Sequence, residues 1–154
     1  MNKLLLLPLL VLILFSCSQK DELDSMNREE STHQALSNIK QAQKWQLVQM
    51  SGQIRNSVQK GADMPWQEHY VLNPDGSFSK VRQKGDETTA ATGVYTYHST
   101  AGEQYLELTY QSLNTIIGSC DAAGLKETLM VHKDGLQSSW WACDGPGLWY
   151  EQVK

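Results

Sequence analysis

Hydrophobic and polar residues alternate in short runs from residue 44 to the end of the chain. Turn-forming residues separate the runs at intervals of roughly ten residues, as in antiparallel β structure. The runs are rich in aromatic residues, Val, Thr and Leu, which favour strands over helices. Eight runs can be counted, at residues 44–51, 66–72, 77–84, 93–98, 104–111, 125–132, 136–143 and 147–153.

Three short segments between the runs carry turn signals. Residues 73–76 read Asn-Pro-Asp-Gly, in which the proline presets φ and the glycine accepts a positive φ. Residues 133–135 and 144–147 also contain an Asp-Gly pair. Short turns of this kind predict that strands adjacent in sequence also pair in the sheet.

The period-two pattern assigns side chains to the buried face of each strand. These side chains are Trp66, Glu68, Tyr70 and Leu72 on the second run, Leu106, Leu108 and Tyr110 on the fifth, and Leu148 and Tyr150 on the last. Eight meandering strands with one buried face close most economically into a barrel, which removes free strand edges. We therefore predict an all-β fold, an eight-stranded antiparallel up-and-down barrel; a two-sheet sandwich is the alternative.

The first 16 residues have the features of an export signal. Lys3 precedes an apolar run of 12 residues, from 4 to 15, which is shorter than the roughly 20 residues that a membrane-spanning helix needs. Residues 14–17 read Leu-Phe-Ser-Cys, which resembles the lipobox of bacterial lipoproteins. We predict that residues 1–16 are a lipoprotein signal peptide and that Cys17 carries the lipid, with acyl chains such as palmitate; a plain secretory signal is the alternative.

Residues 17–30 are predicted to form a lipidated, flexible tether, because this polar segment cannot bury enough surface to fold alone. Residues 18–22 resemble the Lys-acidic-acidic signal that sends some Gram-negative lipoproteins to the outer leaflet of the outer membrane; an ordinary charged tether fits them equally well. We expect a cell-envelope protein anchored in the outer membrane. Residues 31–154 form the domain, and residues 31–44, which lack Gly and Pro, are predicted to begin it with a short helix.

The composition excludes some classes of partner. The chain has 13 Lys and Arg against 17 Asp and Glu, and removal of Lys3 with the signal leaves 12 against 17. Nucleic acids and anionic lipid headgroups are therefore poor partners for this acidic domain. The length suits one core and one domain, which we expect to be a monomer.

The chain from Trp45 to Lys154 resembles the lipocalin-like lipoproteins, which are small calycin-type barrels behind a lipobox. The resemblance rests on residues 44–48, the hairpin at 70–78, residues 93–97 and the aromatic pair at 149–150. It implies a lipocalin-like barrel that binds a small hydrophobic or amphipathic molecule, without enzymatic activity and without a cofactor.

Charged residues on two predicted buried faces are the main candidates for chemistry. A buried charge must be paired, so one interpretation is a structural pair of Glu68 with Arg82 or Lys80, or a bulge that turns both cations outward. In the other interpretation, both cations hold the carboxylate of an amphipathic ligand such as a fatty acid. The candidate ligand-binding residues are Glu68, Tyr70, Lys80, Arg82, Tyr95, Tyr97, Leu108 and Tyr110.

Two cysteines remain after Cys17 is lipidated, and an even pair in an exported domain predicts a Cys120–Cys143 disulfide. A metal or catalytic thiol is the alternative. The histidines are scattered without ligand spacing, so no metal site is expected. No nucleophile or nucleotide motif occurs in the sequence, and we expect no enzymatic activity.

Trp140 and Trp141 are expected on opposite faces of their run, one in the core and the other exposed or covered by the N-terminal helix. An exposed Trp favours partner binding. The first functional hypothesis is a barrel that binds a small ligand, and the second is a filled barrel whose surface or long loops at 52–65 and 111–124 bind a protein or glycan. A third is inhibition of an enzyme by the loops, as in some calycins. A roomy interior favours the first hypothesis, and a packed interior favours the second.

Overall fold

The computed structural model describes residues 35–100 and 102–154, so the predicted signal peptide, the lipidated Cys17 and the tether lie outside the described residues. The described elements are β1 (Gln43–Ser51), β2 (Gln59–Lys60), the 3-10 helix η1 (Gly61–Asp63), β3 (Gln67–Leu72), β4 (Ser77–Lys84), β5 (Glu87–Thr100), β6 (Glu103–Tyr110), β7 (Lys126–His132), β8 (Gly135–Ser138), the 3-10 helix η2 (Ser139–Cys143) and β9 (Gly147–Val153).

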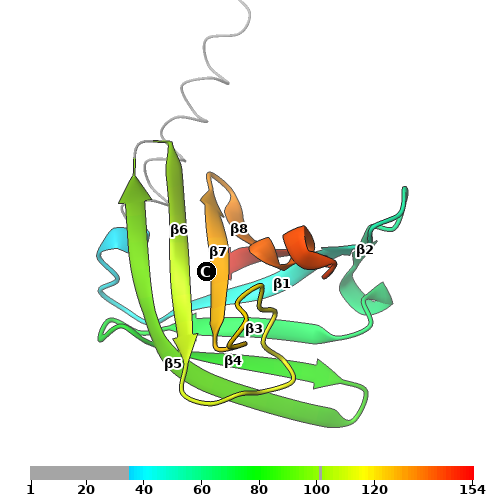
Figure 1. The fold of residues 1–154 in the computed structure, drawn as a ribbon, viewed down its shortest axis with the longest axis horizontal. Coiled ribbons are helices and arrows are strands. Elements are labelled where there is room, and N and C mark those ends of the chain that lie inside the picture. Colours follow the sequence, from blue (N-terminus) through cyan, green and yellow to red (C-terminus); the bar gives the residue numbers. More distant parts are fainter. Residues whose placement is uncertain (1–34, 101) are drawn as a thin grey trace, which may run out of the picture.

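The strands form a closed antiparallel barrel (Figure 1). Hydrogen-bonded neighbours follow the order β1-β3-β4-β5-β6-β7-β8-β9, and β9 pairs back with β1. The short β2 adds to the end of β1, where Gln49 lies opposite Lys60. Because the β1–β9 pairing closes the sheet, the predicted eight-stranded up-and-down barrel is confirmed and the two-sheet sandwich is wrong.

The buried faces follow the predicted alternation. Every side chain predicted to point inward on the second, fifth and last runs is buried, except Trp66, which is partly buried and packs against the core. The longest strand departs from the prediction, since β5 begins at Glu87 rather than at Gly93. Its first residues are mostly Thr and Ala, which pair with β4 but give little hydrophobic signal.

The seventh predicted run is not a single strand. β8 ends at Ser138, whose side chain accepts a hydrogen bond from the Trp140 backbone N–H at 3.2 Å and starts the 3-10 helix η2. Asp144 ends this helix in the left-handed region, with φ of 67°. Trp140 and Trp141 therefore do not alternate across a strand, although Trp140 packs against the core and Trp141 is 51% exposed, as predicted for such a pair.

The predicted N-terminal helix ends earlier than expected, at residue 37 rather than near residue 44. Residues 35–37 are helical, residues 31–34 lie outside the described residues, and β1 already begins at Gln43. Leu36 and Ile39 are buried in the core cluster, and the Gln43 side chain donates a hydrogen bond to the Ala35 carbonyl at 3.1 Å. The segment therefore covers the barrel before the chain enters β1.

The barrel has two distinct ends, which we call end A and end B. End A carries residues 35–42 and the turns between β3 and β4, β5 and β6, and β7 and β8. End B carries the segments 52–66, 85–86, 111–125 and 139–146. The longer connections, which are the candidate functional segments, therefore gather at end B.

Candidate functional site

Four charged side chains meet inside the barrel toward end B, and we call them the charge cluster: Glu68 on β3, Lys80 and Arg82 on β4, and Glu127 on β7. The side chains of Glu68, Lys80 and Glu127 are completely buried, and that of Arg82 is 11% exposed. The alternation of β3 and β4 turns Glu68 and Arg82 to the same side, directly opposite one another in the register.

The charges in the cluster pair with one another. The Lys80 Nζ lies 2.8 Å from Glu127 Oε1 and 3.3 Å from Glu68 Oε1. The Arg82 Nε lies 2.5 Å from Glu68 Oε2. Two carboxylates and two cations give a neutral group, which is the condition under which buried charges are tolerated. Both structural pairs considered for Glu68 are present, and the cations do not turn outward.

Three buried tyrosines complete the hydrogen bonding of the carboxylates. The hydroxyls of Tyr70 and Tyr110 donate to Glu127 Oε2, the first at 2.8 Å, and the Tyr150 hydroxyl donates to Glu68 Oε1 at 2.5 Å. Burial, together with the nearby carboxylates, raises the pKa of each of these hydroxyls above its ordinary value of 10.0. The tyrosines therefore remain protonated donors.

The pKa of Glu127 is shifted in the opposite direction. Burial alone raises its pKa, but the Lys80 ammonium and the hydroxyls of Tyr110 and Tyr70 together outweigh the burial. The pKa of Glu127 consequently lies below its ordinary value of 4.5, and the carboxylate is charged at neutral pH.

The segment between β6 and β7, residues 111–125, covers the charge cluster, and we call it the covering loop. The Ile116 carbonyl accepts hydrogen bonds from Lys80 Nζ at 2.8 Å and from Arg82 Nη2 at 3.2 Å. The Gly118 N–H donates to Glu127 Oε1 at 2.5 Å. A Cβ at position 118 would lie 2.8 Å from Glu127 Oε1 and from the Trp140 ring, so only glycine fits this close approach.

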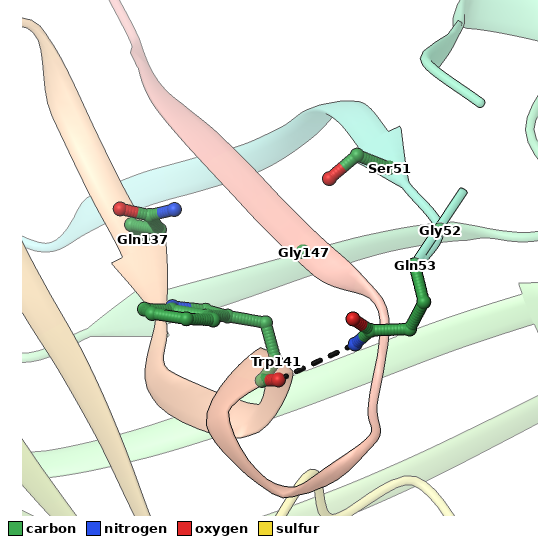
Figure 2. Close-up of a pocket in the computed structure, with 6 residues that line it drawn as sticks. All are labelled: Ser51, Gly52, Gln53, Gln137, Trp141 and Gly147. Atoms are coloured by element: carbon green, nitrogen blue, oxygen red, sulfur yellow. Dashed lines mark hydrogen bonds between the residues drawn. The ribbon is translucent and has the colours of Figure 1, made fainter. Parts of the chain in front are cut away.

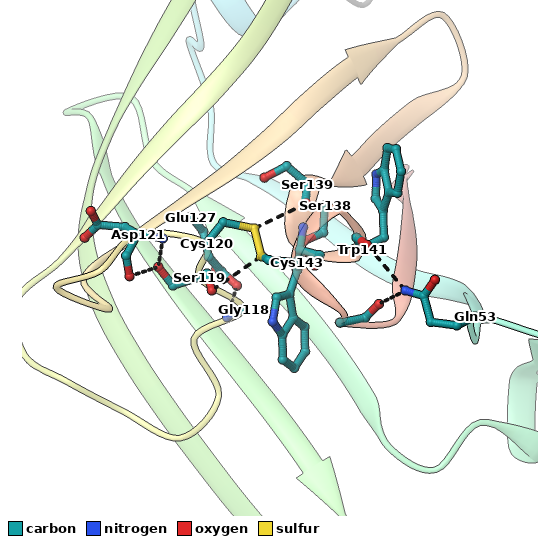
Figure 3. Close-up of a disulfide and its surroundings, with 12 residues drawn as sticks. Gln53, Gly118, Ser119, Cys120, Asp121, Glu127, Ser138, Ser139, Trp141 and Cys143 are labelled. Atoms are coloured by element: carbon teal, nitrogen blue, oxygen red, sulfur yellow. Dashed lines mark hydrogen bonds between the residues drawn. A yellow bond between two sulfur atoms is a disulfide. The ribbon is translucent and has the colours of Figure 1, made fainter.

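The disulfide joins the covering loop to η2 (Figure 3). Cys120 and Cys143 are bonded with a Cα–Cα distance of 5.8 Å, which confirms the predicted pair. Both residues are exposed, and the bond lies over the same end of the barrel as the charge cluster. The covering loop is thus fixed by hydrogen bonds from the interior and by a covalent bond at the surface.

Five of the eight candidate residues meet in or beside the charge cluster: Glu68, Tyr70, Lys80, Arg82 and Tyr110. Of the other three, Leu108 lies opposite Glu127 in the β6–β7 register but contributes only apolar packing. Leu108 is a fully buried core residue, whereas Tyr95 and Tyr97 are partly buried toward end A. The Tyr95 hydroxyl donates to the Asn73 carbonyl at 2.7 Å, in the turn between β3 and β4.

Sequence reasoning missed Glu127 and the role of Tyr150. Glu127 occupies the same face of β7 as the buried Leu129 and Val131, so the alternation that indicated Glu68 could also have indicated Glu127. Tyr150 was predicted to point inward, but its carboxylate partner is 82 residues away in the chain. The contributions of Ile116 and Gly118 are made by backbone groups, which no residue pattern reveals.

A second feature of end B is a surface pocket of about 270 Å³ (Figure 2). It lies beside η2, where the ends of β1, β8 and β9 come together. Its lining residues are Ser51, Gly52, Gln53, Gln137, Trp141 and Gly147. The charge cluster is enclosed, whereas this pocket is open to solvent.

Comparison with known proteins identifies no relative, because no family model matches the chain and no curated protein or solved structure is significantly similar to it. Within residues 35–100 and 102–154, no helix has the length and apolarity needed to cross a bilayer. The same residues contain no group of three or more side chains placed to hold a metal ion.

Proposed function

We propose that the protein is a lipid-anchored module of the cell envelope whose barrel is filled by its own side chains and which binds a protein or glycan at its outer surface. The enclosed charge cluster is the observation that carries this proposal. Its three fully buried charged side chains already have partners within the chain. The role proposed is binding without catalysis, by a monomer.

A ligand in the half of the barrel toward end B would have to break the charge cluster. Separating one member of a buried pair leaves an uncompensated charge, which costs about 3–5 kcal/mol. The ligand would also have to displace the Ile116 carbonyl from Lys80 and Arg82. Binding at a site outside the barrel neither separates a buried pair nor displaces the Ile116 carbonyl, and this supports binding of a partner at the outer surface.

The position of end B suits a surface role. The described chain begins at end A, where Ala35 contacts Gln43 at the start of β1. If Cys17 carries lipid, the anchor joins the domain from the side of end A, and end B lies on the opposite side of the barrel. The exposed Trp141 and its pocket then face away from the attachment point.

A second candidate function is binding of an amphipathic carboxylate in a lipocalin-like cavity, at the edge of the charge cluster. Arg82 is the cluster member with some exposure, and its guanidinium carbon lies 4.4 Å from the centre of the Trp66 ring. The Trp66 indole N–H has no hydrogen-bond partner within the described residues. An incoming carboxylate could use both groups, but it would compete with Glu68 for Arg82.

Mass spectrometry of the protein purified from membranes tests both candidates and the anchor. Under denaturing conditions, we expect a chain that begins at Cys17 and carries the additional mass of acyl groups, and a Cys17→Ser variant that lacks them. Under native conditions, we expect no further adduct, and we expect added fatty acids and hydrophobic dyes not to bind.

Three results would count against the proposal. An unmodified Cys17 would remove the anchor, and a discrete adduct released by organic solvent would favour the ligand-binding barrel. Binding of fatty acid that an Arg82→Gln variant loses would locate that ligand at the second candidate site.

A further inference from the structure

The surface pocket combines an aromatic face with uncharged polar groups. Trp141 is 51% exposed, which is unusual for the largest apolar side chain in a folded domain. Two amide side chains and one hydroxyl line the pocket together with Trp141, from Gln53, Gln137 and Ser51. In the part of the chain that the structure describes, no acidic or basic side chain lines this pocket.

The pocket is held in shape before any ligand arrives. The Gln53 side-chain amide donates to the Trp141 carbonyl at 3.3 Å (Figure 2) and to the Gly145 carbonyl at 3.0 Å, which links segment 52–58 to η2 across the sequence. The nearby disulfide holds η2 from its other side (Figure 3). Such preorganisation reduces the ordering cost of binding.

Glycine keeps the pocket open at its base. Gly147 on β9 lies opposite Ser51 on β1, and a Cβ at position 147 would lie 2.4 Å from the Ser51 hydroxyl oxygen. Any larger residue would fill this space. Gly147 and Gly52 therefore line the pocket beside the polar side chains without filling it.

We propose that this pocket binds one sugar ring of a neutral saccharide, an inference that rests on the proposed surface-binding function. The apolar C–H face of a pyranose ring can pack on the exposed indole face, as amphipathic ligands do on Trp. Its hydroxyls can donate to and accept from the Gln137 amide and the Ser51 hydroxyl, and they can donate to the Gln53 side-chain oxygen, since the Gln53 amide hydrogens already bond the Trp141 and Gly145 carbonyls. The volume of about 270 Å³ is of the order of a single sugar ring rather than a peptide segment or an acyl chain.

The chemistry of the pocket argues against other ligands. An anionic sugar or phosphate needs a cation to replace its hydration, and the lining supplies none. An acyl chain would offer no hydrogen-bond partner to the Gln137 amide or the Ser51 hydroxyl in the lining. A neutral saccharide satisfies the indole face and the polar groups together.

Isothermal titration calorimetry with the lipidated protein in phospholipid nanodiscs tests the inference. The probes are maltotetraose, cellotetraose, mannotetraose and chitotetraose, with anionic tetragalacturonate for comparison. At least one neutral probe is expected to bind. A Trp141→Ala variant should weaken that binding by about tenfold or more, whereas Trp141→Phe, which keeps an aromatic face, should weaken it less.

Two further variants complete the test. Gln137→Ala should weaken binding by several-fold, through loss of an amide beside the indole. Val94→Ala is the control, because Val94 is 57% exposed on β5 and does not line the pocket. Its affinity should equal that of the unmodified protein. All variants should show unchanged thermal unfolding, since each altered side chain is exposed or partly exposed.

The inference is overturned if no neutral probe binds, if Trp141→Ala binds as tightly as the unmodified protein, or if tetragalacturonate binds as well as the neutral probes. These failures are separate from failure of the proposed function. A lipid adduct in the native mass spectrum would refute the filled barrel even if a saccharide bound at Trp141. Conversely, if no saccharide binds but the mass spectra are as expected, the saccharide site is refuted and the lipid-anchored, filled barrel is not.

Discussion

At the scale of single residues, Lys80 is the most constrained position in the barrel. Its ammonium has three acceptors, from two carboxylates and the Ile116 carbonyl, and lies 5.0 Å from the centre of the Tyr70 ring. A lysine with no exposed surface is unusual, because its charge must be matched by partners in fixed positions. Lys80 thus connects β3, β7 and the covering loop through one atom.

Replacement of Lys80 by Met should be strongly destabilising. Met fills a similar volume, but two buried carboxylates would lose their shared cation, for an expected loss of about 3–5 kcal/mol in the free energy of unfolding. Denaturant titration measures this loss. Lys126→Met is the control, because its 3.0 Å pair with Glu107 is largely exposed and should contribute about 1 kcal/mol or less. Equal losses in the two variants would show that the cluster is not a stabilising unit.

At the scale of elements, local pattern explains the strands better than the connections. The turn at 73–76 forms as its residues indicate, with Gly76 at φ of 82° and its N–H bonded to the Asn73 carbonyl. Alternation also identified the inward faces, including Glu68. The covering loop has no periodic pattern of hydrophobic residues. Its position depends on hydrogen bonds between its backbone and the side chains of Lys80, Arg82 and Glu127, which come from strands β4 and β7. The site was therefore predictable as charged residues pointing inward, but its enclosure was not.

Loss of the disulfide should loosen the covering loop before the barrel. A Cys120→Ser, Cys143→Ser double variant removes a crosslink between residues 23 apart and should lower the free energy of unfolding by about 3 kcal/mol. Hydrogen exchange should show faster exchange of the covering loop and η2, whereas the amides of β3 and β4 stay protected. Exchange that rises equally in all strands would contradict a local role for the bond.

At the scale of the whole molecule, the charge cluster joins distant parts of the barrel wall. Glu68 and Glu127 come from β3 and β7, and the Tyr150 hydroxyl from β9 bonds Glu68, so the cluster and its donors span the interior instead of pairing adjacent strands alone. Leu36 and Ile39 close the opposite end with apolar packing. The barrel is thus apolar toward end A and ionic toward end B, so the pH dependence of its stability should arise from the groups at end B.

Acid should destabilise the whole barrel through Glu127. Its folded-state pKa is lowered, so its contribution is present above its ordinary pKa of 4.5 and is lost as the pH falls through the folded-state value. A Glu127→Gln variant should be less stable at pH 7, and its deficit relative to the unmodified protein should shrink as the pH falls below 4.5, the ordinary pKa of this carboxyl group. Chemical unfolding at several pH values measures the two profiles. Glu107→Gln is the control, because Glu107 belongs to an exposed pair, and its free energy of unfolding should change with pH as that of the unmodified protein does. If the free energy of unfolding of Glu127→Gln also follows the unmodified protein at every pH, Lys80 and the tyrosines do not hold the Glu127 carboxylate in its charged form.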